Sequence, residues 1–518
     1  MSASAGAPHP SRAAPSGSKA MLMTAVCLGW FMIQLDTIVV NVALPPIGED
    51  LDASVSDLQW VIDGYMLALG SLMLIGGRLG DRYGHKRIFL LGLALFTVGS
   101  ALCALAPTSS ALIWFRVLQG AGAALELPAT LAILSTRFPD RTELARAIGI
   151  WIGVGGLSFV LGPVIGGVVV DAVSWEAVFA MNIPIAIAAA VIAIRVVPEP
   201  RREEGGSLDV AGQMLGTAAL ALVVYAAIEG ESQGWGSPEI VGLFAAGAAC
   251  LVGFLLVERR ARTPVLPLGI FASARFSAAN VAGFVMGFAM FGLLFLFVLF
   301  FSVVQGASPT ETGLRFLPLS AVFVIVGPLV GRWVDRIGYR LPSALGLGLV
   351  AVGTLSFVRT DVDSSYGTLV WSFVVIGIGY GLASTPMAAV VMSTVTPGRF
   401  GMASSVNNTA RQVGGVFGVA VVGAILGGGG IAGVEPAAQE AYGAEFVDGL
   451  HTAVWVCALA ALAGALVAAR FITNAEAETE PGRAAEGIEP QVREAVPASP
   501  ALEPAQDAAT SPQRPAGG

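Results

Sequence analysis

Charged residues are scarce in this chain of 518 residues. Only 12% of its residues are Asp, Glu, Lys or Arg, against about a quarter in ordinary soluble proteins. So few charges cannot cover the surfaces of several soluble domains, and the composition excludes a multidomain soluble enzyme. The net charge of −8 provides no basic surface for nucleic acid, and no nucleic-acid partner is expected.

Cysteine and histidine are rare as well. The four cysteines lie inside apolar runs without the spacing of a metal site, and the three histidines form no cluster. We therefore interpret the cysteines as buried apolar side chains and expect no metal site.

Long apolar stretches, by contrast, fill most of the sequence. About 20 apolar residues cross the hydrocarbon core of a bilayer. Short polar breaks divide the chain into fourteen stretches of that length, at 21–43, 58–77, 88–106, 110–132, 147–170, 177–197, 209–229, 238–257, 277–301, 313–331, 342–359, 367–392, 405–428 and 450–472. The sequence therefore predicts an all-α polytopic membrane protein with 14 transmembrane helices.

The distribution of arginine predicts its orientation. Cytoplasmic loops of membrane proteins are enriched in Lys and Arg. With both termini inside, nearly all loop cations fall in the cytoplasmic loops, at 78–87, 137–146, 195–202, 259–262 and 332–340. The opposite loops are acidic, so the sequence predicts two cytoplasmic termini.

A repeated segment predicts the domain organisation. The sequence GRLGDRYGHK at 77–86 is echoed by GRWVDRIGYR at 331–340. The echo follows the tenth span instead of the eighth, which indicates a helix pair inserted between two six-helix halves, as repeated halves are common in secondary transporters. We predict a disordered cytoplasmic tail, a first half, an inserted pair, a second half and a second disordered tail, at 1–20, 21–200, 201–262, 263–472 and 473–518.

Four motifs of the first half together resemble a known family. They are LDTIVVNVALP at 35–45, the segment 77–87, RVLQGAG at 116–122, and Gly149 with Gly162, Pro163, Gly166 and Gly167. In this order they are similar to the fourteen-helix drug:proton antiporter branch of the major facilitator superfamily. His85 replaces a usual arginine and Ser158 a usual glycine. The resemblance covers about 21–472 and implies proton-driven export, because the last motif resembles antiporters and not symporters.

Three ionisable residues are predicted to share the outer half of the first domain. A charge near the bilayer centre is costly and normally faces a cavity or a partner. Asp36, Asp63 and Arg116 lie at similar depths, which suggests a charge relay in which Arg116 changes partner as protons move. The alternatives are a structural hydrogen bond for Asp36, and a fixed ion pair for Arg116 with Asp63 near the headgroups.

Glu126 departs from the family, which commonly has an apolar residue there. An intramembrane carboxylate can attract a cationic substrate or carry a second proton. The alternative is a local hydrogen bond with a neighbouring helix.

Further residues are predicted to shape the substrate site or the conformational change. Asn41, Asn280 and Met286 are candidates for the substrate site, because polar or soft side chains suit varied apolar ligands. Arg411 is expected to face the inner loop instead of a cavity. The conformational candidates are a cytoplasmic charge latch and a flexible fifth span: Asp81, Arg82, Asp335 and Arg336, and Gly162 with Pro163.

The predicted function is proton-coupled export of hydrophobic or amphipathic small molecules such as drugs, antibiotics or natural products, by alternating access. No phosphate-binding Gly-x-x-x-x-Gly-Lys-Ser/Thr loop occurs, so the proton gradient is the expected energy source, without a cofactor. We expect a monomer in a bacterial plasma membrane, with protons, substrate and lipid as its partners. A dedicated exporter or importer of one metabolite stays open as an alternative. A membrane enzyme is disfavoured because no catalytic cluster is visible.

Overall fold

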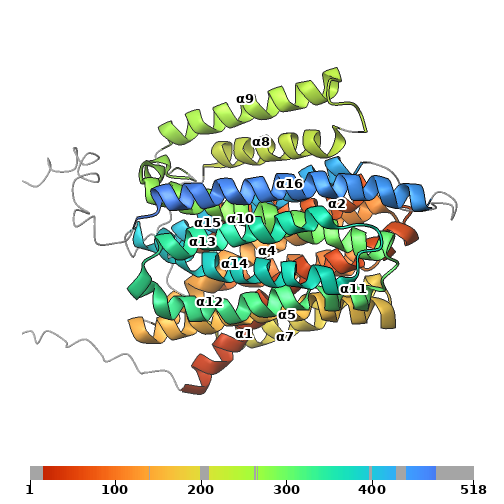
Figure 1. Cartoon of the computed structure of the whole chain (residues 1–518). Coiled ribbons are helices and arrows are strands. Elements are labelled where there is room, and N and C mark those ends of the chain that lie inside the picture. Colours follow the sequence, from red (N-terminus) through yellow and green to blue (C-terminus); the bar gives the residue numbers. More distant parts are fainter. Residues whose placement is uncertain are drawn as a thin grey trace, which may run out of the picture. The chain divides into compact units, whose positions relative to one another are not determined.

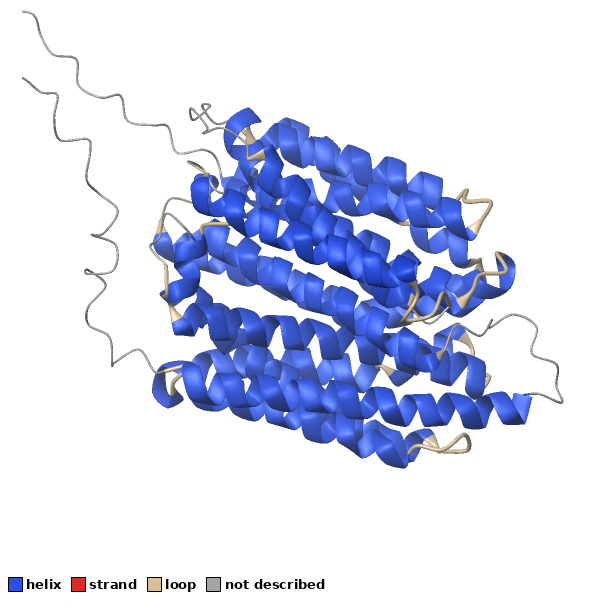
Figure 2. Ribbon diagram, turned by 90° about the horizontal axis from the view of Figure 1, so that it is seen from above, coloured by secondary structure: helices blue, strands red, loops and turns tan. Residues whose placement is uncertain are grey.

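The computed structural model describes residues 16–138, 140–198, 209–230, 232–261, 264, 266–395, 400–427 and 439–473. These residues form helices and connecting loops without a strand (Figure 2). In chain order the α-helices are α1 (Ser16–Asp50), α2 (Val55–Tyr83), α3 (His85–Cys103), α4 (Ser109–Arg137), α5 (Arg141–Ala172), α6 (Trp175–Ala180), α7 (Asn182–Val196), α8 (Val210–Glu229), α9 (Pro238–Arg260), α10 (Ala274–Leu299), α11 (Pro309–Arg315), α12 (Leu317–Ile337), α13 (Arg340–Leu355), α14 (Tyr366–Ser393), α15 (Phe400–Leu426) and α16 (Gln439–Phe471).

The described residues contain 14 helices that are long and apolar enough to cross a membrane. This confirms the predicted all-α membrane fold and its number of spans. The predicted tails at 1–20 and 473–518 lie outside the described residues, except for 16–20 and 473. Residues 16–20 are helical because α1 begins at Ser16, and Lys19 pairs with Glu143 of α5 at 2.6 Å.

Two spans are interrupted where the sequence predicts continuous helices. The span predicted at 177–197 consists of α6 and α7, and the span predicted at 313–331 consists of α11 and α12. Pro184 and Pro318 lie in the first turns of α7 and α12. Proline lacks the N–H group that would continue a preceding helix, so each break lies just before a proline.

The helices form two groups that meet along two interfaces. In the first group, α1 packs against α5 and α7, and α4 packs against α2 and α3. In the second group, α10 packs against α15 and α16, and α14 packs against α12 and α13. The groups meet where α2 contacts α15 and where α5 contacts α11 and α12. We call these groups the first and second halves.

The pair α8 and α9 packs at the side of the two halves (Figure 1). α8 contacts both α2 and α15, and Gln213 of α8 donates a hydrogen bond to the carbonyl of Ser71 at 2.6 Å. α9 contributes few buried residues. The pair therefore covers one of the two interfaces between the halves.

Small residues allow the helices of the first half to pack closely. A Cβ atom on Gly122 of α4 would lie 2.5 Å from the backbone nitrogen of Phe96 in α3. Glycine is enriched at such contacts in membranes because its lack of a side chain lets backbones approach. α4 is thereby held at a fixed rotation, which determines where Arg116 and Glu126 point.

Below, the end of the bundle at which α2 begins and α5 ends is called the outer end, following the predicted orientation. The opposite end, at which α1 begins, is called the inner end.

Candidate functional site

A buried ion pair joins α1 to α4. Asp36 and Arg116 are both within 1% of complete burial, and Asp36 Oδ2 lies 2.5 Å from Arg116 Nη1. The other carboxylate oxygen, Oδ1, accepts hydrogen bonds from Gln119 Nε2 at 2.9 Å and from Asn182 Nδ2 at 2.8 Å. Four side chains from α1, α4 and α7 therefore form one connected polar cluster inside an apolar bundle.

Arg116 is held by further contacts. Its Nε donates to the carbonyl of Val61 in α2 at 3.0 Å, and its Nη1 also donates to Gln119 Oε1 at 2.6 Å. The guanidinium carbon lies 4.2 Å from the centre of the Tyr65 ring, a favourable distance for a cation–π contact. The charge of Arg116 is thus compensated on several sides, as a buried charge requires.

Sequence reasoning predicted Asp36 and Arg116 but missed Gln119 and Asn182. Gln119 stands three residues after Arg116 on the same helix, a spacing that places two side chains together, so this signal was available. Asn182 lies at the start of α7 after the break, and a single polar residue in an apolar stretch gives no comparable signal.

Asp63 occupies a different place from Arg116. Gln59, Asp63 and Gly70 share one face of α2 at spacings of four and seven residues. This face packs against α15: Gln59 Nε2 donates to the Val419 carbonyl at 3.0 Å, and a Cβ on Gly70 would lie 3.2 Å from the Cβ of Gln412. Asp63 is fully buried, with no hydrogen-bond partner among the described residues. It lies at the contact between the two halves, while Arg116 pairs with Asp36.

Glu126 is fully buried within the first half. Neither of its carboxylate oxygens has a hydrogen-bond partner in the described part of the chain. The carboxyl group packs against Gly29 of α1, and its Cβ lies 3.0 Å from where a Cβ on Gly92 of α3 would be. Glu126 therefore points toward α1 and α3.

The three other candidates for the substrate site make local contacts. Asn41 is buried and donates to the carbonyl of Thr37 on its own helix at 2.9 Å. Asn280 donates to the carbonyl of Phe276 at 2.8 Å and accepts a bond from Asn407 of α15 at 3.4 Å. Met286 is nearly buried, and its carbonyl accepts the hydroxyl of Tyr380 at 3.0 Å.

An apolar cavity lies between the two halves. Its lining comes from α1, α5, α10, α12 and α14 and the short segments beside them: Ile38, Phe159, Pro163, Met290, Leu293, Leu294, Phe316, Leu319, Ser320, Phe357, Phe373, Ile376 and Tyr380. Only a serine and a tyrosine hydroxyl interrupt this apolar wall. Asn41, Glu126, Asn280 and Met286 are not among these lining residues.

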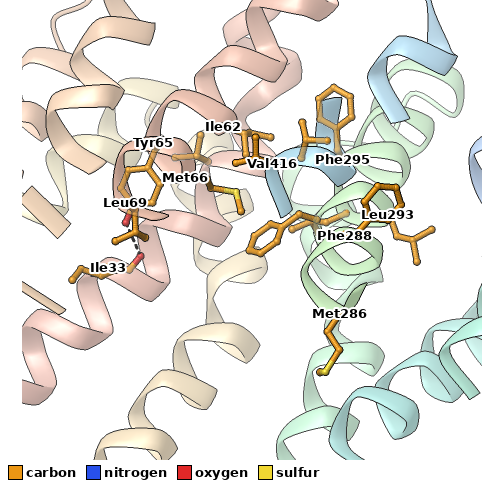
Figure 3. Close-up of a cluster of buried hydrophobic side chains, with 14 of the residues drawn as sticks. Ile33, Ile62, Tyr65, Met66, Leu69, Met286, Phe288, Leu293, Phe295 and Val416 are labelled. Carbon is orange, nitrogen blue, oxygen red and sulfur yellow. Dashed lines mark hydrogen bonds between the residues drawn. The ribbon is translucent and has the colours of Figure 1, made fainter. Parts of the chain in front are cut away.

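Apolar side chains also fill the space between α2 and α10. Figure 3 shows Met66 of α2 and Phe288 of α10 within one buried cluster, together with Val416 of α15. This packing brings helices of the two halves into direct contact.

At the outer end the halves meet backbone to backbone. A Cβ on Gly167 of α5 would lie 2.6 Å from Thr310 Cα, and a Cβ on Gly313 of α11 would lie 2.6 Å from the carbonyl carbon of Pro163. The Thr310 N–H donates to Asp171 Oδ2 at 2.9 Å. We call Pro163, Gly167, Thr310 and Gly313 the outer gate, and it is closed. Gly162, beside it, packs against Ile38 of α1.

At the inner end α5 separates from the second half. Gly149, Gly153 and Gly156 share one face of α5. A Cβ on Gly156 would lie 3.3 Å from Val324 of α12, whereas no described atom lies within 4 Å of the Cβ positions of Gly149 and Gly153. α5 and α12 therefore diverge toward the inner end.

The predicted latch residues lie at this open inner end. Asp81 pairs with His85 of its own half at 3.2 Å, and 59% of the Asp81 side chain is exposed. Arg82 lies over the ring of its neighbour Tyr83 at 5.3 Å. Arg336 is exposed, and the side chain of Asp335 lies outside the described part of the chain. A latch that closes the inner end is not engaged by Asp81 in this arrangement.

Comparison with known proteins identifies the family. The chain is 38% identical over 406 residues to the tetracenomycin C resistance and export protein of Streptomyces glaucescens, covering 78% of this chain and 75% of that protein. It is also 38% identical over 407 residues to the multidrug resistance protein Stp of Mycobacterium tuberculosis (strain CDC 1551 / Oshkosh), with the same coverage.

Among solved structures, the chain is similar to an inward-facing bacterial homologue of the human lysosomal transporter Spinster. The TM-score is 0.63 at 18% identity, and the match covers 89% of this chain and 98% of that one. A family model of the Major Facilitator Superfamily matches residues 26–419, three quarters of the sequence. The chain therefore belongs to the Major Facilitator Superfamily.

Proposed function

We propose that this protein exports hydrophobic or amphipathic small molecules across a bacterial plasma membrane in exchange for protons. The observation that carries the proposal is the buried Asp36–Arg116 pair beside an apolar cavity. Ile38, two residues after Asp36 on α1, lines that cavity. A change of charge at Asp36 therefore acts on the helix that forms part of the cavity wall.

Protonation of Asp36 is the proposed coupling step. A proton on the carboxylate removes the negative charge that holds Arg116 and weakens the bonds from Gln119 and Asn182, because charge-assisted hydrogen bonds are the stronger ones. α1 is then free to shift against α4. Release of the proton on the cytoplasmic side restores the ion pair.

Asp63 links protons to the closed interface of the two halves. Its carboxyl group has no described partner and lies where α2 packs on α15. A negative charge at that contact is costly in an apolar environment. We propose that loss of a proton from Asp63 separates α2 from α15. Rebinding of the proton then favours the arrangement in which α2 packs on α15 and the outer gate is closed.

Glu126 is the proposed second proton carrier. The carboxyl group lies between α1, α3 and α4, away from the cavity lining, which supports the proton role over direct contact with substrate. No cofactor takes part in this scheme, since the proton gradient supplies the energy, and a single chain contains both halves, so a monomer suffices. Small molecules, protons and lipid are the partners, and neither nucleic acid nor an enzymatic reaction is involved.

The substrate class follows from the cavity and from the relatives. The cavity wall is apolar, which suits hydrophobic drugs, antibiotics or natural products. One relative is named for multidrug resistance and another for resistance to and export of a single compound. The second name favours an alternative candidate, a dedicated exporter of one metabolite.

Dye efflux from cells tests the proposal. Cells producing the wild type, Asp36→Asn, Glu126→Gln or the control Glu239→Gln, an exposed residue of α9, are loaded with ethidium, with and without a protonophore. We expect protonophore-sensitive efflux by the wild type and the control, and none by Asp36→Asn. Efflux that survives in Asp36→Asn contradicts the coupling role of Asp36.

Two further outcomes separate the alternatives. The assay is repeated with a neutral dye: loss of ethidium efflux alone in Glu126→Gln assigns Glu126 to recognition, and equal loss for both dyes assigns it to the proton. A wild type that moves no dye favours the dedicated exporter.

A further inference from the structure

α15, a helix of the second half, carries a polar face between its inner end and its middle. Ser404, Asn408 and Arg411 recur at spacings of four and three residues, so they lie on one side of the helix. Arg411 is eleven residues after Phe400, the first residue of α15, which places it about 16 Å along the helix at about 1.5 Å per residue. Arg411 is therefore at mid-depth and not at the inner loop, contrary to the expectation from the sequence.

This side of α15 points between the two halves. Gly415 lies one turn beyond Arg411 on the same side. A Cβ on Gly415 would contact the end of the Met66 side chain, which belongs to α2 in the first half. It would also lie 2.7 Å from Phe291 Cδ2, which belongs to α10 in the second half. At Gly415 this space is filled by apolar side chains, whereas at Arg411 it is open, since the Arg411 side chain is exposed.

The charge of Arg411 is not neutralised by the helices around it. Arg411 Nη2 donates to Asn408 Oδ1 at 2.9 Å, and the described residues provide it with no ion pair. Among the helices that contact α15, α10 and α14 contain no acidic residue, and α15 itself has none. The acidic residues of α8 and α16 lie toward the outer end, and Glu126 of α4 points toward α1 and α3. On α2, the Gly70 carbonyl accepts a hydrogen bond from Thr409, two residues before Arg411 on α15. Asp63 lies seven residues nearer the outer end than Gly70. Arg116, in contrast, is fully buried and paired.

Arg411 does not line the apolar cavity, but it lies within one turn of the cavity wall along α10. The Arg411 carbonyl packs against Gly287 of α10. Met290, which lines the cavity, follows three residues later, about 4.5 Å nearer the outer end. The exposed cation and the apolar wall are therefore close enough in depth for one amphipathic molecule to contact both.

We propose that Arg411, together with Asn408, binds the anionic group of amphipathic substrates while their apolar part occupies the cavity. The substrate class is organic anions in which a carboxylate, sulfonate or phenolate is attached to an apolar ring system. The guanidinium group suits this role because it forms paired, charge-assisted hydrogen bonds to planar oxyanions. This inference rests on the proposed export function and specifies its substrates.

Two probes with the same aromatic skeleton test it. 1-Anilinonaphthalene-8-sulfonate carries a negative charge, and N-phenyl-1-naphthylamine lacks it. The full chain is purified, reconstituted into liposomes with an imposed pH gradient, and assayed for transport of each probe. The variants are Arg411→Gln, Arg411→Lys and the control Arg470→Gln, which removes an exposed arginine at the end of α16.

We expect Arg411→Gln to lower transport of the sulfonate at least about tenfold and to change transport of the neutral amine less than about twofold, since one lost charge-assisted contact is worth a factor of this size. Arg411→Lys keeps the charge but loses the paired geometry, so its sulfonate transport should lie between those of Arg411→Gln and the wild type, and Arg470→Gln should match the wild type. A sulfonate-to-amine ratio that stays unchanged in Arg411→Gln overturns the inference, as does equal loss of both probes.

The wild type separates this inference from the function on which it rests. Transport of the amine without the sulfonate refutes the anion site and leaves the export function intact. Transport of neither probe refutes both the anion site and broad export of amphipathic molecules, and favours the dedicated exporter. Binding of the two probes to the purified variants, followed by fluorescence, gives a second readout, in which only the affinity for the sulfonate should fall in Arg411→Gln.

Discussion

The outer gate can be forced open by one methyl group. In Gly313→Ala the new Cβ would lie 2.6 Å from the carbonyl carbon of Pro163. Carbon atoms in favourable contact are about 3.5 Å apart, so α5 and α11 would have to separate by at least about 0.9 Å, and by more because the Pro163 carbonyl oxygen lies closer still. The obstacle is backbone of the opposite half, which cannot turn away as a flexible side chain could.

The structure gives the size of the expected effect. Overpacking of a close contact costs about 1–3 kcal/mol. Because the gate exists only in the closed arrangement, this cost falls on that arrangement alone. At about 1.4 kcal/mol per factor of ten, the ratio of gate-closed to gate-open molecules should fall between about fivefold and about 150-fold.

Distance measurements between spin labels can detect this shift. Labels at Val173 in the first half and Asp363 in the second, both exposed and at the outer end, are introduced into a chain without native cysteines. We expect a longer-distance population to grow in Gly313→Ala. Gly348→Ala on α13, where no described atom lies within 4 Å of the added Cβ, is the matched control. A distance distribution that is the same in Gly313→Ala, the control and the wild type would refute the reasoning.

Three further predictions concern the buried polar groups. Arg116→Gln should lower the free energy of unfolding in detergent by about 3–5 kcal/mol, because it leaves the Asp36 carboxylate unpaired, and adding Asp36→Asn should recover part of the loss in a denaturation series. If the double variant is no more stable than Arg116→Gln, the pair is not coupled. Gln119→Leu should reduce proton-driven efflux while the protein stays folded, as it removes one bond to Asp36 and one to Arg116; unchanged efflux would show that these bonds are dispensable. Gly29→Ala should lower the melting temperature because its methyl group displaces the Glu126 carboxyl, and Glu126→Ala should restore it; a double variant as unstable as Gly29→Ala would contradict the packing described.

The all-α membrane fold and its number of spans were predictable from hydrophobicity alone, because spans of about 20 apolar residues are set by the thickness of the bilayer. The two broken spans were missed since the apolar run continues through each break, and only Pro184 and Pro318 mark where the backbone hydrogen bonds are interrupted.

The site was predictable in part. The charge and depth of Asp36 and Arg116 were visible in the sequence, and they meet in the structure. Depth along a helix is given by counting residues, but rotation about its axis depends on packing. This explains why Asp63, at a similar depth, faces α15, and why Arg411 faces the space between the halves.

The outer gate is built from main-chain atoms and glycines, while the cavity beneath it is built from side chains. Apart from Pro163, which belongs to both, substitutions in the cavity wall can therefore alter which compounds are accepted without changing the residues of the outer gate. Under selection by a new toxin, such a protein can broaden or change its resistance spectrum in single steps. Its gate glycines, by contrast, have almost no tolerated replacement, which makes the outer gate a more durable target for an inhibitor than the cavity.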